Sequence, residues 1–147
     1  MSGFSSGGQS SFNISFGSNS CSNLTTTFLW PGNELEQASQ IVEAYQPIRL
    51  PPGKTAKISK MRVRANNPAT GQKSTFTLRK RSPGGPGAFV DTLLVADLNA
   101  GSAIASDDVN EVSLIDGDEF SVQCVPTVGQ TAGPSTYVMA IFLVTLD

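Results

Sequence analysis

The sequence predicts an all-β fold, an antiparallel β-sandwich of jelly-roll type with an extended N-terminal arm. Two observations support this prediction. From residue 24 onward, short segments rich in β-branched and aromatic residues follow one another at regular spacing, and turn-forming residues close them. The length of 147 residues is that of one ordinary domain, which can bury a core without metals or disulfides. We therefore expect an arm over residues 1–23 and one sandwich domain over residues 24–147.

The expected arm is dominated by Ser, Gly and Asn and carries no charged residue. A segment of this composition cannot build a core of its own, so we expect it to become ordered by lying on a neighbouring subunit or a larger assembly. Phe4, Phe12 and Phe16 are spaced through the arm and are the expected anchors on that surface.

The strands of the domain are predicted from their composition and from the turns that follow them. The first four end at turn-forming segments rich in proline, glycine or asparagine, at residues 31–32, 51–53, 66–68 and 82–87. Further on, Asp116-Gly117 is a tight turn between two strands. The expected strands lie within residues 24–30, 41–50, 57–65, 74–81, 88–96, 110–115, 118–125 and 135–146.

Basic residues are concentrated in the middle of the chain. All ten Lys and Arg lie between residues 49 and 81, whereas nine of the twelve Asp and Glu follow from residue 91, in a chain of formal net charge −2. Apolar and basic residues alternate over residues 60–65, which places the cations of this strand on one side. We expect a basic contact face made of Lys60, Arg62 and Arg64 together with Arg79 and Arg81 on an adjacent strand.

Three interpretations of this basic face stay open. It is a solvated strand face, or it meets an acidic protein surface, or it binds nucleic acid. The acidic surface would belong to a capsid or to the acidic third of a neighbouring copy, where Asp107, Asp108 and Glu111 lie. Nucleic acid is the weakest of the three, because no aromatic residue for base stacking is interleaved with the cations of residues 49–75.

The last expected strand, residues 135–146, is apolar on both of its faces. One face of an antiparallel sandwich strand normally meets water, so the second apolar face is covered by the rest of the chain or buried in a subunit contact. We expect a subunit contact, and the pattern alone does not say which face makes it. The candidate interface residues are therefore taken from both faces: Tyr137, Met139, Ala140, Ile141 and Phe142.

Catalytic, metal and membrane functions find little support. The chain has no His and only two Cys, so transition-metal sites lack ligands, and no nucleophile motif is present. We expect no enzyme activity, no metal and no cofactor. Cys21 and Cys124 could form a disulfide, although two free thiols are the more usual arrangement in a chain of this length. No apolar run approaches a membrane span, and the N-terminus has no secretory signal pattern.

The order of motifs resembles small virion proteins of tailed bacteriophages that have a jelly-roll or tumour-necrosis-factor-like fold. The motifs are TTFLWPG, YQPIRLPPGKTAKISKMRVRANN, STFTLRKRSPGGPGAFVDTLLVADLNAGS and SLIDGDEFSVQCV, which together span about residues 24–147. Residues 77–80 stand where that family has a TLRKNG-like hairpin, with Arg81-Ser82 in place of Asn-Gly, and residues 116–118 stand for its GD turn.

The resemblance implies a capsid decoration (cement) protein that binds the outer surface of a phage head as a homotrimer. Its partners would be other copies of itself and the major capsid protein or another virion protein. Its place would be the capsid surface of a virion, after synthesis in the host cytoplasm. The alternative that the resemblance leaves open is a fibre head or neck component that binds a receptor or carbohydrate.

Overall fold

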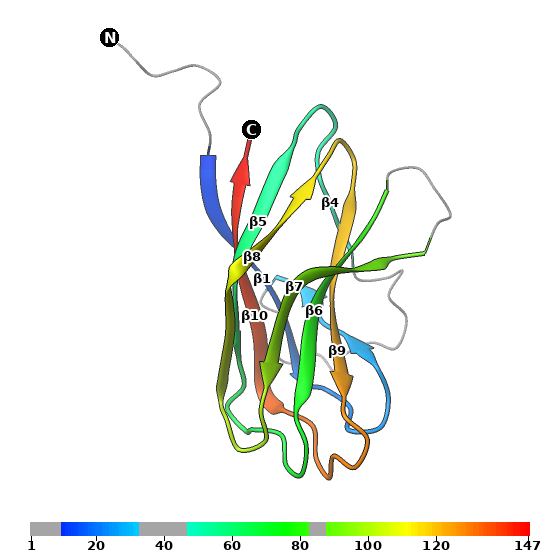
Figure 1. The fold of residues 1–147 in the computed structure, drawn as a ribbon, viewed down its shortest axis with the longest axis vertical. Coiled ribbons are helices and arrows are strands. Elements are labelled where there is room, and N and C mark those ends of the chain that lie inside the picture. Colours follow the sequence, from blue (N-terminus) through cyan, green and yellow to red (C-terminus); the bar gives the residue numbers. More distant parts are fainter. Residues whose placement is uncertain (1–9, 33–46, 83–87) are drawn as a thin grey trace.

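The computed structural model describes residues 10–32, 47–82 and 88–147. These residues form β-strands joined by turns and loops (Figure 1). The strands are β1 (Ser10–Ser20), β2 (Thr27–Phe28), β3 (Trp30–Pro31), β4 (Ile48–Arg49), β5 (Ala56–Arg64), β6 (Ser74–Arg81), β7 (Val90–Leu98), β8 (Ile104–Leu114), β9 (Glu119–Pro126) and β10 (Ser135–Leu146).

The strands form two antiparallel sheets. Sheet A has the order β3-β1-β10-β5-β8, and sheet B has the order β2-β9-β6-β7, with β4 also paired to β9. From β5 onward the chain changes sheet at the connections β5 to β6, β7 to β8, β8 to β9 and β9 to β10. These crossings interleave the two sheets in the manner of a jelly roll. The predicted all-β, antiparallel, jelly-roll sandwich is therefore confirmed.

The core lies between the two sheets and is built from the inward side chains of both. Its largest fully buried members include Phe16, Phe76 and Phe142. The ring of Phe16 meets the edges of two other rings, those of Phe120 and Phe142, each at 6.2 Å between centroids. Because Phe120 comes from sheet B and Phe16 from sheet A, the contact between these two rings joins the sheets.

Strand β1 is the main departure from the sequence prediction. Residues 10–20 do not form a separate arm, because they pair with β10 of the same chain from Ser10 opposite Leu146 to Ser20 opposite Ser135. Phe16 is 0% exposed, so it belongs to the core and cannot anchor the chain on another surface. Phe12, at the outer end of the strand, stays 44% exposed. Residues 1–9, with Phe4, lie outside the described residues.

Three further strands differ from the prediction. The strand expected over residues 110–115 already begins at Ile104, and residues 104–114 form β8 at the edge of sheet A. Of the strand expected over residues 41–50, Ile48–Arg49 forms β4, and residues 41–46 lie outside the described residues. The strand expected over residues 24–30 is instead two short strands in different sheets, β2 in sheet B and β3 in sheet A. The remaining expected strands coincide with observed ones, with shifts of a few residues at their ends.

Candidate functional site

The outer face of sheet A gathers most of the residues that the sequence singled out. From Tyr137 to Thr145 of β10 the burial alternates, because successive side chains of a strand point to opposite faces. The side chains on the outer face are those of Tyr137, Met139, Ile141 and Leu143. Ala140 and Phe142 are 0% exposed and face the core. Their prediction as interface residues is therefore wrong, and the odd-numbered face is the one available to a partner.

Strand β5 lies beside β10 and places a row of cations along its apolar stripe. Arg64 is opposite Met139 and Arg62 is opposite Ile141. A β-bulge between Ser59 and Met61 leaves Lys60 unpaired in the ladder, and Lys60 is exposed. The three cations of residues 60–65 thus share the outer face of sheet A, as their alternation predicts.

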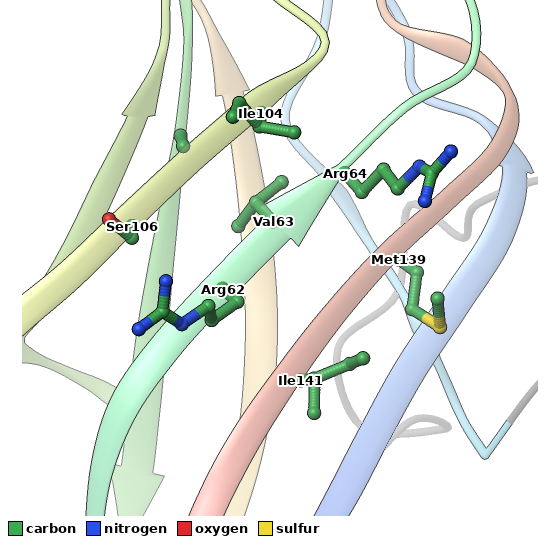
Figure 2. A pocket seen from close by; sticks show the side chains of 8 residues that line it. Arg62, Val63, Arg64, Ile104, Ser106, Met139 and Ile141 are labelled. Carbon is green, nitrogen blue, oxygen red and sulfur yellow. The ribbon is translucent and has the colours of Figure 1, made fainter.

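Two grooves run over this face between the strands. The larger has a volume of about 460 Å³ and lies between β5, β8 and β10, lined by Arg62, Arg64, Ile104, Ser106, Met139 and Ile141 among others (Figure 2). The smaller, of about 280 Å³, continues on the other side of Arg62 and Ile141 and reaches Asn13 of β1. In Figure 2 the two guanidinium groups extend in different directions, Arg62 toward β8 and Arg64 over β10. The floor of the larger groove is apolar and its rim is cationic.

Backbone strain is concentrated on the same face. Among the described residues, the non-glycine residues with positive φ are Lys60 at 54°, Thr136 at 57° and Tyr137 at 63°. This left-handed region costs a non-glycine residue on the order of 1–3 kcal/mol, so surrounding contacts must enforce it. At Thr136 they are visible: the side-chain amide of Asn67 donates to its hydroxyl at 2.8 Å, and the amide N–H of Asn66 donates to its carbonyl at 3.0 Å. The positive φ angles of the adjacent residues Thr136 and Tyr137 direct the half-exposed Tyr137 ring to the outer face at the start of β10.

The two charge-biased thirds of the sequence neutralise each other across neighbouring strands. Every ion pair that the described residues are seen to form joins a cation of the middle third to an acid of the last third. The pairs are Arg49–Glu119 at 3.7 Å, Lys57–Glu111 at 3.6 Å, Arg62–Asp108 at 3.0 Å, Lys73–Asp97 at 2.9 Å, Arg81–Glu119 at 3.0 Å and Arg79–Asp91. Lys60 and Arg64 have no acidic partner among the described residues, and both lie on the outer face of sheet A.

Arg79 and Arg81 are not part of this face. They lie on β6, which belongs to sheet B, because the chain crosses from one sheet to the other between β5 and β6. The guanidinium of Arg81 pairs with Glu119 and lies over the Phe89 ring at 4.3 Å from its centroid. The predicted adjacency of the two basic strands is therefore wrong, and the five cations do not form one continuous stripe for a phosphate backbone.

The acids proposed to meet the cations in a neighbouring copy are already engaged within the chain. Asp108 and Glu111 pair with Arg62 and Lys57. Asp107 is buried and accepts hydrogen bonds from the backbone of Val95, at 3.1 Å, and from Asn110. Burial raises the pKa of the Asp107 carboxyl, but these hydrogen bonds outweigh burial and hold its pKa below the usual value. Asp107 thereby ties β8 of sheet A to β7 of sheet B.

Other kinds of site find no support in the described part of the chain. No three residues among its His, Cys, Asp and Glu lie close enough together to hold a metal ion. None of its segments is a helix long and apolar enough to cross a membrane.

Sequence reasoning missed part of the outer face. Ile104, which is 70% exposed, borders the larger groove, and Asn13 borders the smaller one. Ile104 was overlooked because the strand was expected to begin only at residue 110. The alternation of Phe12, Ile14 and Phe16 was available as a signal that residues 10–20 form a strand whose polar side includes Asn13.

No protein-family model and no curated protein sequence matches this chain. Solved structures with a similar fold include the globular domain of zebrafish complement 1qA protein, with 14% identity and a TM-score of 0.48 over 90% of this chain and 94% of that one. Eiger TNF from S. frugiperda has 10% identity and a TM-score of 0.48 over 90% and 91%. Murine APRIL has 14% identity and a TM-score of 0.47 over 91% and 98%.

Proposed function

We propose that this chain is a structural virion protein that assembles as a homotrimer and decorates the outer surface of a phage head. The observation that supports self-assembly is the outer face of sheet A. It combines an apolar stripe of β10 with two cations that lack acidic partners among the described residues and with enforced backbone strain. Such a face is expected where a strand meets another protein surface rather than water alone. The order of motifs along the sequence supports the place on a phage head.

In the proposed trimer the outer faces of three sheets A meet around an axis. Met139 and Ile141 of β10 supply the apolar contact at its centre. Each of these side chains contributes up to about 1.5–3 kcal/mol when fully buried. Lys60 and Arg64 lie on β5 beside this stripe and remain available to an acidic surface of the capsid, because Asp107, Asp108 and Glu111 are engaged within the chain. The cations then contribute steering and orientation more than affinity.

The assembly is tested by sedimentation equilibrium of the purified chain and two matched variants. Ile141→Glu places a charge at the centre of the outer face of sheet A. Leu93→Glu makes the same apolar-to-acidic change on β7 of sheet B, where Leu93 is 75% exposed. We expect a trimer for the unmodified chain and for Leu93→Glu, and a folded monomer for Ile141→Glu. A monomeric unmodified chain would remove the proposed trimer.

The place on the particle is tested by cryo-electron microscopy of virions. Density for the jelly roll on the shell surface is the expected result. Density at the tail tip or the neck would instead support a receptor-binding role. A gel-shift titration with duplex DNA at 150 mM salt serves as a second check, and submicromolar binding would contradict the decoration role, because two unpaired cations on one face provide only a weak non-specific site.

A further inference from the structure

Two cysteines that are 103 positions apart in sequence (124 minus 21) meet in the core of the sandwich. Cys21 directly follows β1 of sheet A and is 6% exposed, and Cys124 lies in β9 of sheet B and is 0% exposed. Both belong to the same core cluster and both are free thiols. The Cys21 side chain lies near enough to the Cys124 thiol to raise its pKa. The contact therefore spans the two sheets.

The backbone on both sides of this contact is held in place. The amide N–H of Cys21 donates to the carbonyl of Pro134 at 2.9 Å. Gly133 passes so near that a Cβ there would lie 2.1 Å from the Cys21 carbonyl oxygen, so only glycine permits this approach. Cys124 is paired on one side with Thr27 and on the other with Phe76. The two thiols thus face each other from fixed positions rather than from loops that move independently.

A chain of polar groups leads from the surface loop to the thiol of Cys124. The side-chain amide of Gln130, which is 5% exposed, donates to the hydroxyl of Ser74 at 2.8 Å. The Ser74 hydroxyl, by accepting that bond, has its own hydrogen free to donate to Cys124, with which it is in contact. Burial raises the pKa of the Cys124 thiol, as does the neighbouring Cys21, while the Ser74 hydrogen bond acts in the opposite direction. Ser74 is therefore placed to stabilise the thiolate when it forms.

We propose that Cys21 and Cys124 are a redox-convertible pair that a small disulfide oxidant joins into a covalent link between the two sheets. The thiolate of Cys21, the less buried of the two, attacks the oxidant and forms a mixed disulfide, with release of one thiol. The thiolate of Cys124 then attacks the Cys21 sulfur and releases the second thiol. The pair loses two electrons and two protons, and the oxidant disulfide gains them as two thiols.

The link would close a loop of roughly 100 residues, which restricts the unfolded chain strongly in the chain-entropy account. It would also fix the C-terminal end of β1 to β9. We expect the melting temperature of the oxidised chain to exceed that of the reduced chain by on the order of 10 °C.

The test is oxidation of the full chain with glutathione disulfide, both in the folded state and during refolding from denaturant in a glutathione redox buffer. The expected product is a single chain with no free thiol and a mass lower by two hydrogen atoms, with the raised melting temperature. In the folded state we expect the rate of disulfide formation to increase with pH, since the thiolate is the attacking form. The second step, in which Cys124 attacks the mixed disulfide, should slow several-fold in Ser74→Ala.

The unmodified chain is compared with two single variants, Cys21→Ser and Cys124→Ser. Each variant retains one thiol and is expected to show no intramolecular link and no oxidant-dependent rise in melting temperature. The proposal is overturned if the unmodified chain keeps two titratable thiols in both protocols, or forms only covalent dimers. It is also overturned if oxidation lowers the melting temperature, because the geometry of the pair would then be incompatible with a disulfide.

Discussion

The outer faces of the two sheets differ in how their polar groups are satisfied. On sheet B the cations Lys73, Arg79 and Arg81 each meet an acid of the same chain. On sheet A an apolar stripe runs along β10, and Lys60 and Arg64 beside it have no acidic partner among the described residues. On sheet B these cations are therefore neutralised within the chain, whereas on sheet A a second protein surface would be needed to pair Lys60 and Arg64. One outer face of a small sandwich can thus be suited to solvent while the other is suited to a subunit contact.

The largest expected effect concerns two adjacent residues of β10 that point to opposite faces. Ala140→Glu places a charge in the core, where Ala140 is 0% exposed, and we expect a loss of roughly 3–5 kcal/mol or more, so that no folded chain is recovered. Met139→Glu places the same charge on the outer face, and we expect a folded monomer. Circular dichroism and sedimentation measure both variants. If Met139→Glu also fails to fold, the two faces of β10 are not distinct as described.

The next comparison is along β1, between its inner and its outer end. Phe16→Ala removes a ring that contacts Phe120 and Phe142, and we expect unfolding free energy to fall by about 3–5 kcal/mol. Phe12→Ala removes a ring that is 44% exposed, and we expect a loss below about 1.5 kcal/mol. Urea unfolding followed by tryptophan fluorescence provides both values. Similar losses for the two variants would mean that β1 is not anchored through Phe16.

Stability at acid pH depends on two carboxylates, those of Asp107, which joins the two sheets, and of Asp97, which pairs with Lys73. A hydrogen bond from Lys73 holds the pKa of Asp97 below its usual value, and the pKa of Asp107 is lowered as well. A carboxyl with a lowered folded-state pKa stabilises the fold above its unfolded pKa of about 4, and this stability is lost as pH falls through the folded pKa.

The variant Asp107→Asn tests how much Asp107 contributes to the loss of stability at low pH. The neutral amide removes two of the acceptor sites used by Val95, Val109 and Asn110, and we expect a loss of about 1–3 kcal/mol at pH 7. Because the variant has one titrating carboxyl fewer, its stability should fall less steeply below pH 4 than that of the unmodified chain. Urea titrations at pH 7 and pH 3 measure this difference. An identical slope for the two chains would exclude Asp107 as a source of acid sensitivity.

The smallest expected effect compares a paired cation with an unpaired one. Lys73→Met breaks the half-exposed ion pair with Asp97 on sheet B and should cost about 0.2–1 kcal/mol. Arg64→Met on sheet A should change the stability of the monomer by less than about 0.5 kcal/mol, because no ion pair is lost. The Ile141→Glu background, in which the new carboxylate lies opposite Arg62 and not opposite Arg64, keeps both measurements on the monomer. A larger loss for Arg64→Met than for Lys73→Met would reveal an intrachain role for Arg64.

Most of the fold could be predicted from the sequence because turn-forming residues punctuate it so regularly. Strand β1 was missed because its Ser, Gly and Asn content is that of a flexible segment, and that signal outweighed the alternation of Phe12, Ile14 and Phe16. The alternation of cations on β5 was correctly interpreted, although the bulge at Lys60 is a property of pairing on both sides that one strand's sequence does not contain.

The candidate face could be predicted only in part. Both sides of β10 are apolar, so hydrophobicity alone does not show whether Met139 or Ala140 faces the core. The answer depends on which side of the strand packs against sheet B. Arg79 was placed beside Arg62 because consecutive strands often pair. In this fold the connection from β5 to β6 changes sheets instead, and a local sequence pattern carries no information about that crossing.

The pairing of β1 with β10 has a mechanical consequence. The first described residue, Ser10, is opposite Leu146, so both ends of the described chain leave the sandwich side by side at the same end (Figure 1). A force that separates these ends loads the hydrogen bonds of the ladder one pair at a time, beginning at the ends, rather than all together in shear. We expect single-molecule pulling through the termini to peel β1 away at low force, and a cooperative rupture at high force would contradict this.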